Sequence, residues 1–223
     1  MKILAHRANI LGPDPSIENT PEACLAALRH GFGLEIDLRK EGDSLYYISH
    51  DPQPWRSELD LGVYAKLFTQ YPTLPIAVNV KELGYEADLI ALQKEGVFGK
   101  ESFYFDFELL EPSQPGSAQR ILSALPGGST TKIASRSSDR NESIAQCLSI
   151  PGQVVWADEF DSLWLQESDI RALHEAGREV YAISPELHGF NEAERLQRWA
   201  DFKAWGVDGL CTDFSLAAKE FFA

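Results

Sequence analysis

The chain contains few cysteines and no long apolar segment. Cys24, Cys147 and Cys211 are widely separated and form no Cys-x-x-Cys pair, so the sequence predicts neither a disulfide framework nor a zinc site. Their surroundings are typical of small buried thiols. No apolar run approaches the roughly 20 residues that span a bilayer. Because the first strand signal begins at Lys2, no room is left for a signal peptide, and we expect a protein of the reducing cytoplasm.

Positive charge is also scarce, since 20 Lys and Arg residues accompany 34 Asp and Glu residues and give a formal net charge of −14. This charge argues against binding to nucleic acid or to an anionic membrane surface. An anionic ligand would therefore need local positive charge, for which Arg7, Lys81 and Arg136 are the candidates besides a bound metal ion. The 44% of hydrophobic residues and 24% of charged residues are ordinary for a globular protein.

Segments with the pattern of β-strands alternate with helical segments along the whole chain. The barrel-type strand segments are residues 3–6, 34–38, 76–80, 103–107, 132–135, 154–157, 179–183 and 209–212. The helical segments are residues 21–30, 59–71, 87–95, 117–125, 142–148, 167–176, 192–205 and 216–222, and Thr20, Asn141 and Asn191 are candidate N-caps. A ninth strand segment, residues 45–49, follows a turn and is expected to pair with residues 34–38 as a hairpin. Eight βα units predict an α/β protein with a closed (β/α)8 barrel, formed by residues 1–223 as one domain.

Polar side chains concentrate in four short segments where a strand is followed by a loop or a helix. The segments are residues 5–7 (Ala-His-Arg), 18–20 (Glu-Asn-Thr), 33–37 (Gly-Leu-Glu-Ile-Asp) and 49–51 (Ser-His-Asp). Because strand side chains alternate between two faces, Glu35 and Asp37 share one face. Two carboxylates on one face repel each other unless a proton or a cation lies between them. His6 and His50 flank this pair and have the side chain best suited to acid–base catalysis near neutral pH.

The order of these segments resembles the glycerophosphodiester phosphodiesterase family, whose pattern runs His-Arg-Gly, Glu-Asn-Thr, Glu-x-Asp and His-Asp. Residues 206–213 (Gly-Val-Asp-Gly-Leu-Cys-Thr-Asp) resemble the family's Gly-x-Asp-Gly-x-x-Thr-Asp. The resemblance implies metal-dependent cleavage of a small phosphodiester, with His6 and His50 as general acid and general base. It also implies that Glu35 and Asp37 bind a divalent cation, and oxygen ligands favour Mg²⁺ or Ca²⁺.

The remaining site residues are expected to bind the phosphate or to support the residues that do. Arg7 would contact the phosphate through its forked guanidinium group, and Lys81 would contact it as a point charge. Glu18 would orient Arg7 or a histidine, although it is also a favourable charge at a helix N-terminus. His30, His174 and His188 match no motif and are interpreted as surface or capping residues.

The sequence departs from the family pattern at several positions. Asn79 stands where the family has a third metal-binding carboxylate, and Asp106 at the end of the next strand is the alternative third ligand. Ala8 replaces the Gly of His-Arg-Gly, and residues 183–186 (Ile-Ser-Pro-Glu) replace the family's Trp-Thr-Val-Asn. Residues 52–75 are too few for the usual inserted subdomain, which the related sphingomyelinase D-like phospholipases also lack. We therefore expect an open, shallow site that accepts different alcohol groups.

Two functions are compatible with this pattern. A phosphodiesterase is favoured by the presence of all the predicted catalytic and phosphate-binding groups. A catalytically weak barrel that binds a phosphorylated metabolite as a sensor or carrier is favoured by Asn79 and Ile183. The attacking oxygen can belong to water or to a hydroxyl of the substrate, and the oligomeric state is left open.

Overall fold

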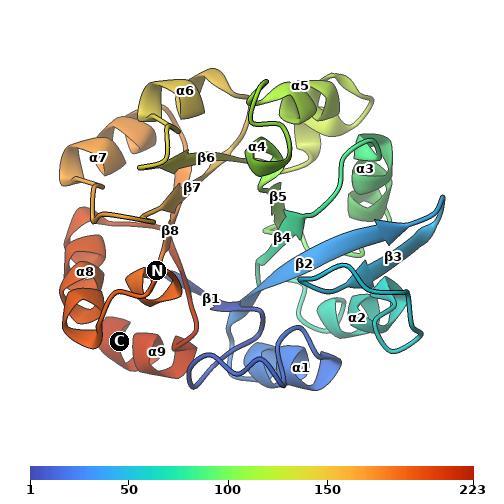
Figure 1. Cartoon of the computed structure of the whole chain (residues 1–223), viewed down its shortest axis with the longest axis horizontal. Helices are drawn as coiled ribbons and strands as arrows, with labels where there is room; N and C mark the ends of the chain where they lie inside the picture. Colours follow the sequence, from blue (N-terminus) through green and yellow to red (C-terminus); the bar gives the residue numbers. More distant parts are fainter.

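The computed structural model describes all 223 residues and consists of eight parallel strands that form a barrel, with helices around it (Figure 1). In chain order the barrel strands are β1 (Lys2–His6), β2 (Gly33–Glu41), β4 (Ile76–Val80), β5 (Phe103–Phe105), β6 (Ala134–Ser138), β7 (Val154–Asp158), β8 (Glu179–Ile183) and β9 (Gly209–Thr212). Strand β9 pairs with β1, whereas β5 and β6 are joined only by the bridge between Tyr104 and Ile133. The predicted (β/α)8 barrel is confirmed, with one weakly paired seam.

The helices follow the barrel strands and pack around the outside of the barrel (Figure 1). They are α1 (Pro21–Arg29), α2 (Leu61–Phe68), α3 (Glu86–Lys94), α4 (Phe107–Leu110), α5 (Ser117–Ala124), α6 (Ile144–Ser149), α7 (Glu167–Glu175), α8 (Glu192–Trp205) and α9 (Ser215–Phe222), with 3-10 turns η1 (Gly128–Thr130) and η2 (Pro185–His188). Thr20 and Asn191 cap α1 and α8 as predicted. The prediction for Asn141 is wrong, because Ser143 caps α6 and Asn141 occupies a left-handed turn position that asparagine tolerates.

Strand β3 (Leu45–Ile48) pairs antiparallel with the end of β2 and lies outside the eight-strand barrel. The pairing runs from Leu38 opposite Ile48 to Glu41 opposite Leu45, as the hairpin prediction requires. Figure 1 shows this hairpin projecting from the barrel next to α2. It returns the chain from Glu41 to the level of Asp37, whose carbonyl oxygen accepts from the Ser49 N–H, so residues 49–51 lie at the mouth of the barrel.

Aromatic side chains fill the barrel interior below its mouth. The rings of Phe105 and Trp156 are 4.1 Å apart, and those of Phe103 and Tyr181 are 4.9 Å apart. The interior is therefore a packed core and not a pore. Polar groups at the C-terminal strand ends rest on this apolar floor. All three cysteines are buried and free, as expected.

None of the helices combines the length and the apolar character that a membrane crossing needs.

Candidate active site

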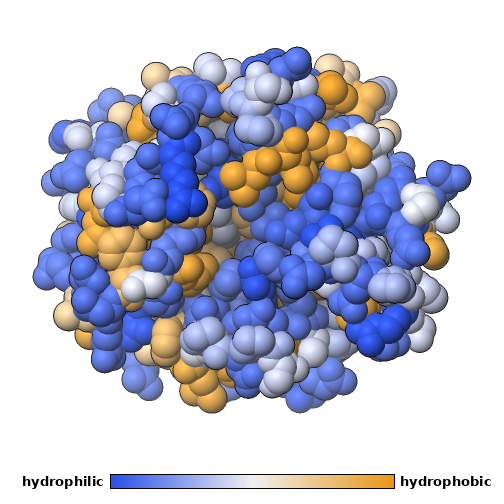
Figure 2. All heavy atoms as spheres, viewed as in Figure 1, coloured by the Kyte–Doolittle hydropathy of each residue, from blue (hydrophilic) through white to orange (hydrophobic).

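A cavity of about 250 Å³ opens at the C-terminal end of the barrel, where βα loops build the active sites of this fold. Figure 2 shows the barrel mouth as a hollow near the centre of the view. Seven of the predicted site residues line the cavity: His6, Arg7, Glu35, His50, Asn79, Lys81 and the alternative ligand Asp106. Asp37 lies buried next to Glu35 and Lys81. The structure therefore brings together residues that are up to 100 positions apart in the chain.

Glu35 and Asp37 point inward from β2 and are almost completely buried, with 2% and 1% of their surface exposed. Burial and the neighbouring charge of Asp37 raise the pKa of Glu35 to about 7. The pKa of Asp37 is lowered instead, because Lys81 and Arg7 outweigh the effect of its burial. A pair of neighbouring carboxylates with opposite shifts can hold a proton or a cation between them.

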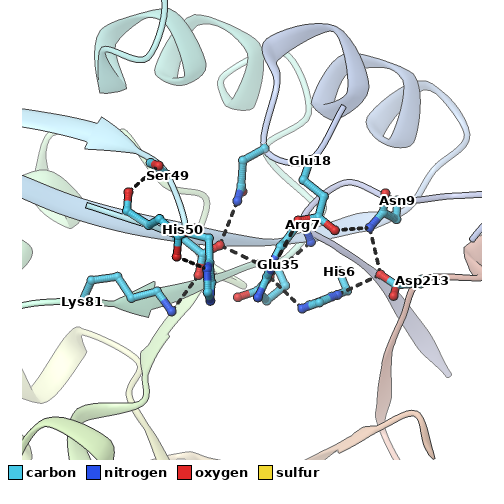
Figure 3. A network of polar contacts seen from close by, with 12 residues as sticks. His6, Arg7, Asn9, Glu18, Glu35, Ser49, His50, Lys81 and Asp213 are labelled. Carbon is cyan, nitrogen blue, oxygen red and sulfur yellow. Dashed lines mark hydrogen bonds and ion pairs between the residues drawn. The ribbon is translucent and has the colours of Figure 1, made fainter. Parts of the chain in front are cut away.

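Two cations and one amide surround Asp37. Lys81 Nζ lies 2.8 Å from Asp37 Oδ1, Arg7 Nε lies 3.6 Å from Asp37 Oδ2, and Asn19 Nδ2 donates to Oδ2 at 2.8 Å. Arg7 Nη1 also donates to Glu18 Oε2 at 3.0 Å, so the predicted orienting contact of Glu18 is present. These contacts place two positive charges at the cavity of a strongly acidic protein (Figure 3).

The turn after β1 is strained, which directs Arg7 toward the site. Arg7 and Ala8 have φ values of 47° and 68°, a region that favours glycine. Ala8 therefore adopts a left-handed conformation that glycine reaches more easily, at a cost of about 1 kcal/mol or more. In this conformation the Arg7 backbone N–H donates to Glu35 Oε2 at 3.2 Å.

His6 is held by a buried carboxylate. Its Nδ1 lies 2.8 Å from Asp213 Oδ1, which also accepts a hydrogen bond from Asn9 Nδ2 at 2.9 Å. Its Nε2 lies 4.0 Å from Glu35 Oε2. Although burial opposes the charged form, Asp213 and Glu35 raise the pKa of His6. Asp213 is the last residue of the C-terminal motif. The motif drew attention to this residue, but it did not predict that Asp213 would hold His6.

His50 is much more accessible than His6. Its side chain is 44% exposed, and its partner Asp51, 2.9 Å away, is 88% exposed. Arg39 Nε donates to the carbonyl oxygens of Ser49 and His50 and holds the loop in place. Figure 3 shows His50 and His6 on opposite sides of Glu35. Both histidines line the cavity that contains Glu35.

The opposite side of the cavity differs from the prediction. Arg136 is buried inside β6, where it forms ion pairs with Asp106, with Asp158 at 3.1 Å and with Glu142 at 3.3 Å. It is therefore not a free cation at the mouth of the site. Strand β6 extends to Ser138, beyond the expected end at residue 135, which places Arg136 within the barrel. Asp106, the alternative third metal ligand, is paired with the same Arg136 and directly follows β5, away from Glu35 and Asp37 on β2.

The interpretation of His188 as a surface or capping residue is wrong. Its Nε2 lies 2.5 Å from Asp158 Oδ1, and its side chain lines the same cavity as His6. No motif contains either residue, and they are 30 positions apart in the chain. Only the adjacency of β7 and β8 brings them together, so no local sequence signal could have identified the pair.

Oxygen atoms of Glu35, Asp37 and Asn79 form the best candidate metal site. Strand pairing places Asn79 directly beside Asp37, and Asn79 Oδ1 is buried without a hydrogen-bond partner. The chain has no group of three or more His, Cys, Asp or Glu side chains arranged to hold a metal ion. Two carboxylates and an unpaired amide oxygen nevertheless fit a hard cation such as Mg²⁺ or Ca²⁺. A bound cation would also offset the repulsion that raises the pKa of Glu35.

A second cavity of about 500 Å³ adjoins the first on the side of β3 and α2. Arg7 and His50 line both cavities, and Glu18, Gln53 and Arg56 line the larger one. The chain between β3 and α2 forms no further helix or strand on this side of the site.

Comparison with known proteins supports the fold. No protein-family model and no curated relative matches the chain. A solved structure assigned as a glycerophosphodiester phosphodiesterase from Galdieria sulphuraria is similar at a TM-score of 0.74 and 17% identity, covering 99% of this chain and 97% of that one. Two such enzymes of Parabacteroides distasonis have TM-scores of 0.68 and 0.64, at 14% and 12% identity. These two comparisons each cover 99% of this chain, and 85% and 96% of the respective enzymes. The resemblance inferred from the motifs therefore extends to the whole barrel.

Proposed function

We propose that the protein is a metal-dependent phosphodiesterase acting on a glycerophosphodiester or a similar small phosphodiester. The products would be an alcohol and a phosphomonoester, or a cyclic phosphate if a substrate hydroxyl attacks. The observation that carries this proposal is the His6–Asp213 pair beside Glu35, in one small cavity with Arg7 and Lys81. The full-length structural likeness to glycerophosphodiester phosphodiesterases supports the same reaction class.

Arg7 and Lys81 would bind the phosphate. A phosphodiester carries one negative charge, which the net charge of −14 would repel without local compensation. Both cations are held in place by Asp37, so little side-chain freedom is lost when a phosphate binds. The Arg7 fork can contact two phosphate oxygens, and Lys81 can contact one.

His6 and His50 would transfer the protons. With Nδ1 of His6 held by Asp213, Nε2 remains available to take a proton from the attacking oxygen, and Asp213 would stabilise the imidazolium that forms. His50 on the other side of Glu35 would serve the second transfer, in which the departing alkoxide becomes an alcohol. The attacking oxygen remains water or a substrate hydroxyl.

Glu35, Asp37 and Asn79 would hold the divalent cation. A bound Mg²⁺ or Ca²⁺ would supply charge stabilisation for a non-bridging phosphate oxygen. The carbonyl oxygen of Asn79 contributes a dipole where a carboxylate would contribute a charge, so the affinity for the cation should be moderate.

The second candidate function is a barrel that binds a phosphorylated metabolite with little or no catalysis, and Asn79 is the observation that favours it. A hydrolysis assay separates the two functions. Cleavage of a chromogenic phosphodiester and of glycerophosphodiesters is measured in EDTA and again after Mg²⁺, Ca²⁺ or Mn²⁺ is restored. The phosphodiesterase should lose activity in EDTA and regain it with one of the metals. Tight binding of a phosphomonoester without hydrolysis of any diester would favour the carrier.

A further inference from the structure

A second pair of histidine and aspartate lies on the side of the cavity opposite the carboxylates of β2. His188, the last residue of η2, places Nε2 at 2.5 Å from Asp158 Oδ1 at the C-terminal end of β7. Arg136 Nη2 donates to the other Asp158 oxygen at 3.1 Å. Both oxygens of this buried carboxylate are therefore engaged, and the imidazole ring is fixed in orientation.

This pair is built like the one that holds His6. Asp213 and Asp158 are both buried at the C-terminal ends of barrel strands, and each is held by a second donor, Asn9 or Arg136. Each carboxylate binds one ring nitrogen of its histidine, and the other ring nitrogen makes no hydrogen bond to the protein. The proposed reaction uses His6 in this state but leaves His188 without a role.

The surroundings of His188 favour a hydroxyl group as its ligand over a quaternary ammonium group. The nearest aromatic ring, Phe160, is 4.4 Å from the His188 ring, but guanidinium groups already lie over it, Arg140 at 4.2 Å and Arg136 at 5.4 Å. Arg136 in turn pairs with Asp106 and Asp158, the carboxylates of this side that line the cavity, so both are already engaged by a cation. The group of His188 that is left to bind a ligand is its second ring nitrogen. This nitrogen accepts a hydrogen bond when the ring is neutral and donates one when the ring is protonated. A hydroxyl group can pair with it in either state, whereas a quaternary ammonium cannot.

We propose that His188, positioned by Asp158, binds a hydroxyl group of one alcohol arm of the diester whose phosphate contacts Arg7 and Lys81. This inference rests on the proposed function and assigns a residue to the recognition of the alcohol arm. His188 and Lys81 line the same cavity of about 250 Å³, which is small compared with typical ligand sites. A short polyol chain attached to the phosphate would therefore extend toward His188.

The test compares glyceryl p-nitrophenyl phosphate with 2-hydroxypropyl p-nitrophenyl phosphate. The second substrate lacks only the terminal hydroxyl, and both keep the hydroxyl that could attack the phosphorus and the same leaving group. Wild-type protein should prefer the glyceryl ester about tenfold in kcat/KM, the size of one hydrogen bond. His188→Phe keeps a ring packed on Phe160 but lacks the ring nitrogens. The ratio of the two kcat/KM values should therefore fall to about one, because kcat/KM for the glyceryl ester decreases while that for the hydroxypropyl ester stays the same.

His174 provides the matched control, because it forms a similar pair with Asp208 at 2.9 Å but does not line the cavity. His174→Phe should keep the tenfold preference, and His188→Gln should keep part of it. An unchanged preference in His188→Phe, an equal loss for both substrates, or no preference in the wild type would each overturn the role of His188 and leave the phosphodiesterase standing. A wild-type protein that cleaves neither ester with any metal would instead reject the proposed function, and this inference with it.

Discussion

Replacing Asn79 by glutamate should convert the candidate metal site into one with three carboxylates. Asn79 is 8% exposed and lies beside Asp37 in the pairing of β2 with β4, so the new charge would be buried next to two others. Without metal we expect the variant to unfold more easily, by about 1–3 kcal/mol. With a divalent cation the added charge attracts the ion by about 8 kcal/mol at 4 Å and an effective dielectric constant of about 20. Repulsion from Glu35 and Asp37 offsets part of this attraction, and we expect binding about 10- to 100-fold tighter.

Calorimetric titration with Mg²⁺ and Ca²⁺ measures the affinity directly, and thermal melting with and without the ion provides a second readout. Asn79→Gln is the matched control, because it has the length of glutamate without the charge. The glutamate variant should show the lower Tm in EDTA and the larger increase of Tm on adding metal, since a ligand that binds only the folded state stabilises it.

Coinciding titrations of the wild type and the Asn79→Glu variant would refute the assignment of Asn79 as a ligand. Asp106 or a neighbouring acid would then fill the third position, and for Asp106 the ion pair with Arg136 would have to open. If neither protein binds a divalent cation, the metal-dependent phosphodiesterase should be abandoned in favour of the carrier.

Three further predictions concern the proton-transfer groups, the buried carboxylate and the open site. Alanine in place of His6 or His50 should lower kcat by about 10²-fold or more toward a chromogenic diester, and full activity in both variants would exclude the acid–base assignment. The pKa of Glu35 is raised from 4.5 to about 7, so its contribution to stability is present below pH 4.5 and is lost as the pH rises through 7. Urea unfolding of the metal-free protein should therefore show a smaller loss of stability between pH 5 and pH 8 in Glu35→Gln than in the wild type, and equal losses would contradict the shift. Finally, kcat/KM for glycerophosphocholine, glycerophosphoethanolamine and glycerophosphoglycerol should differ by less than about 10³-fold, because a larger difference needs roughly 4 kcal/mol of discrimination that an open site does not supply.

Much of the site could be predicted because its residues follow strands in recognisable patterns. The alternation in residues 34–38 placed Glu35 and Asp37 on one face, and the barrel topology placed His6 and Asn79 at the same end as that pair. The hairpin was predictable from its turn, and it accounts for the position of His50. Each of these inferences needs only strand periodicity and the rule that parallel strands end on one side of a barrel.

The other side of the cavity could not be predicted in the same way. Arg136 forms ion pairs with carboxylates from three segments of the chain. Which carboxylates it contacts depends on where strand β6 ends. The predicted strand ended one residue before Arg136, and that small difference in the boundary reversed its interpretation from a free cation to a buried ion-paired one. The pairing of His188 with Asp158 depends likewise on how two loops pack at the barrel mouth.

The alternation of strands and helices, the barrel, and the chemical groups at the ends of its first strands all follow from the amino-acid sequence. These features arise from local backbone preferences and hydrophobic periodicity, which act over a few residues. Which charged groups remain free and which are paired depends on how the strands and loops come together in three dimensions. Ion pairs and the pKa values of buried groups depend on distances of a few ångströms between side chains from different strands, and those distances are set when the barrel closes.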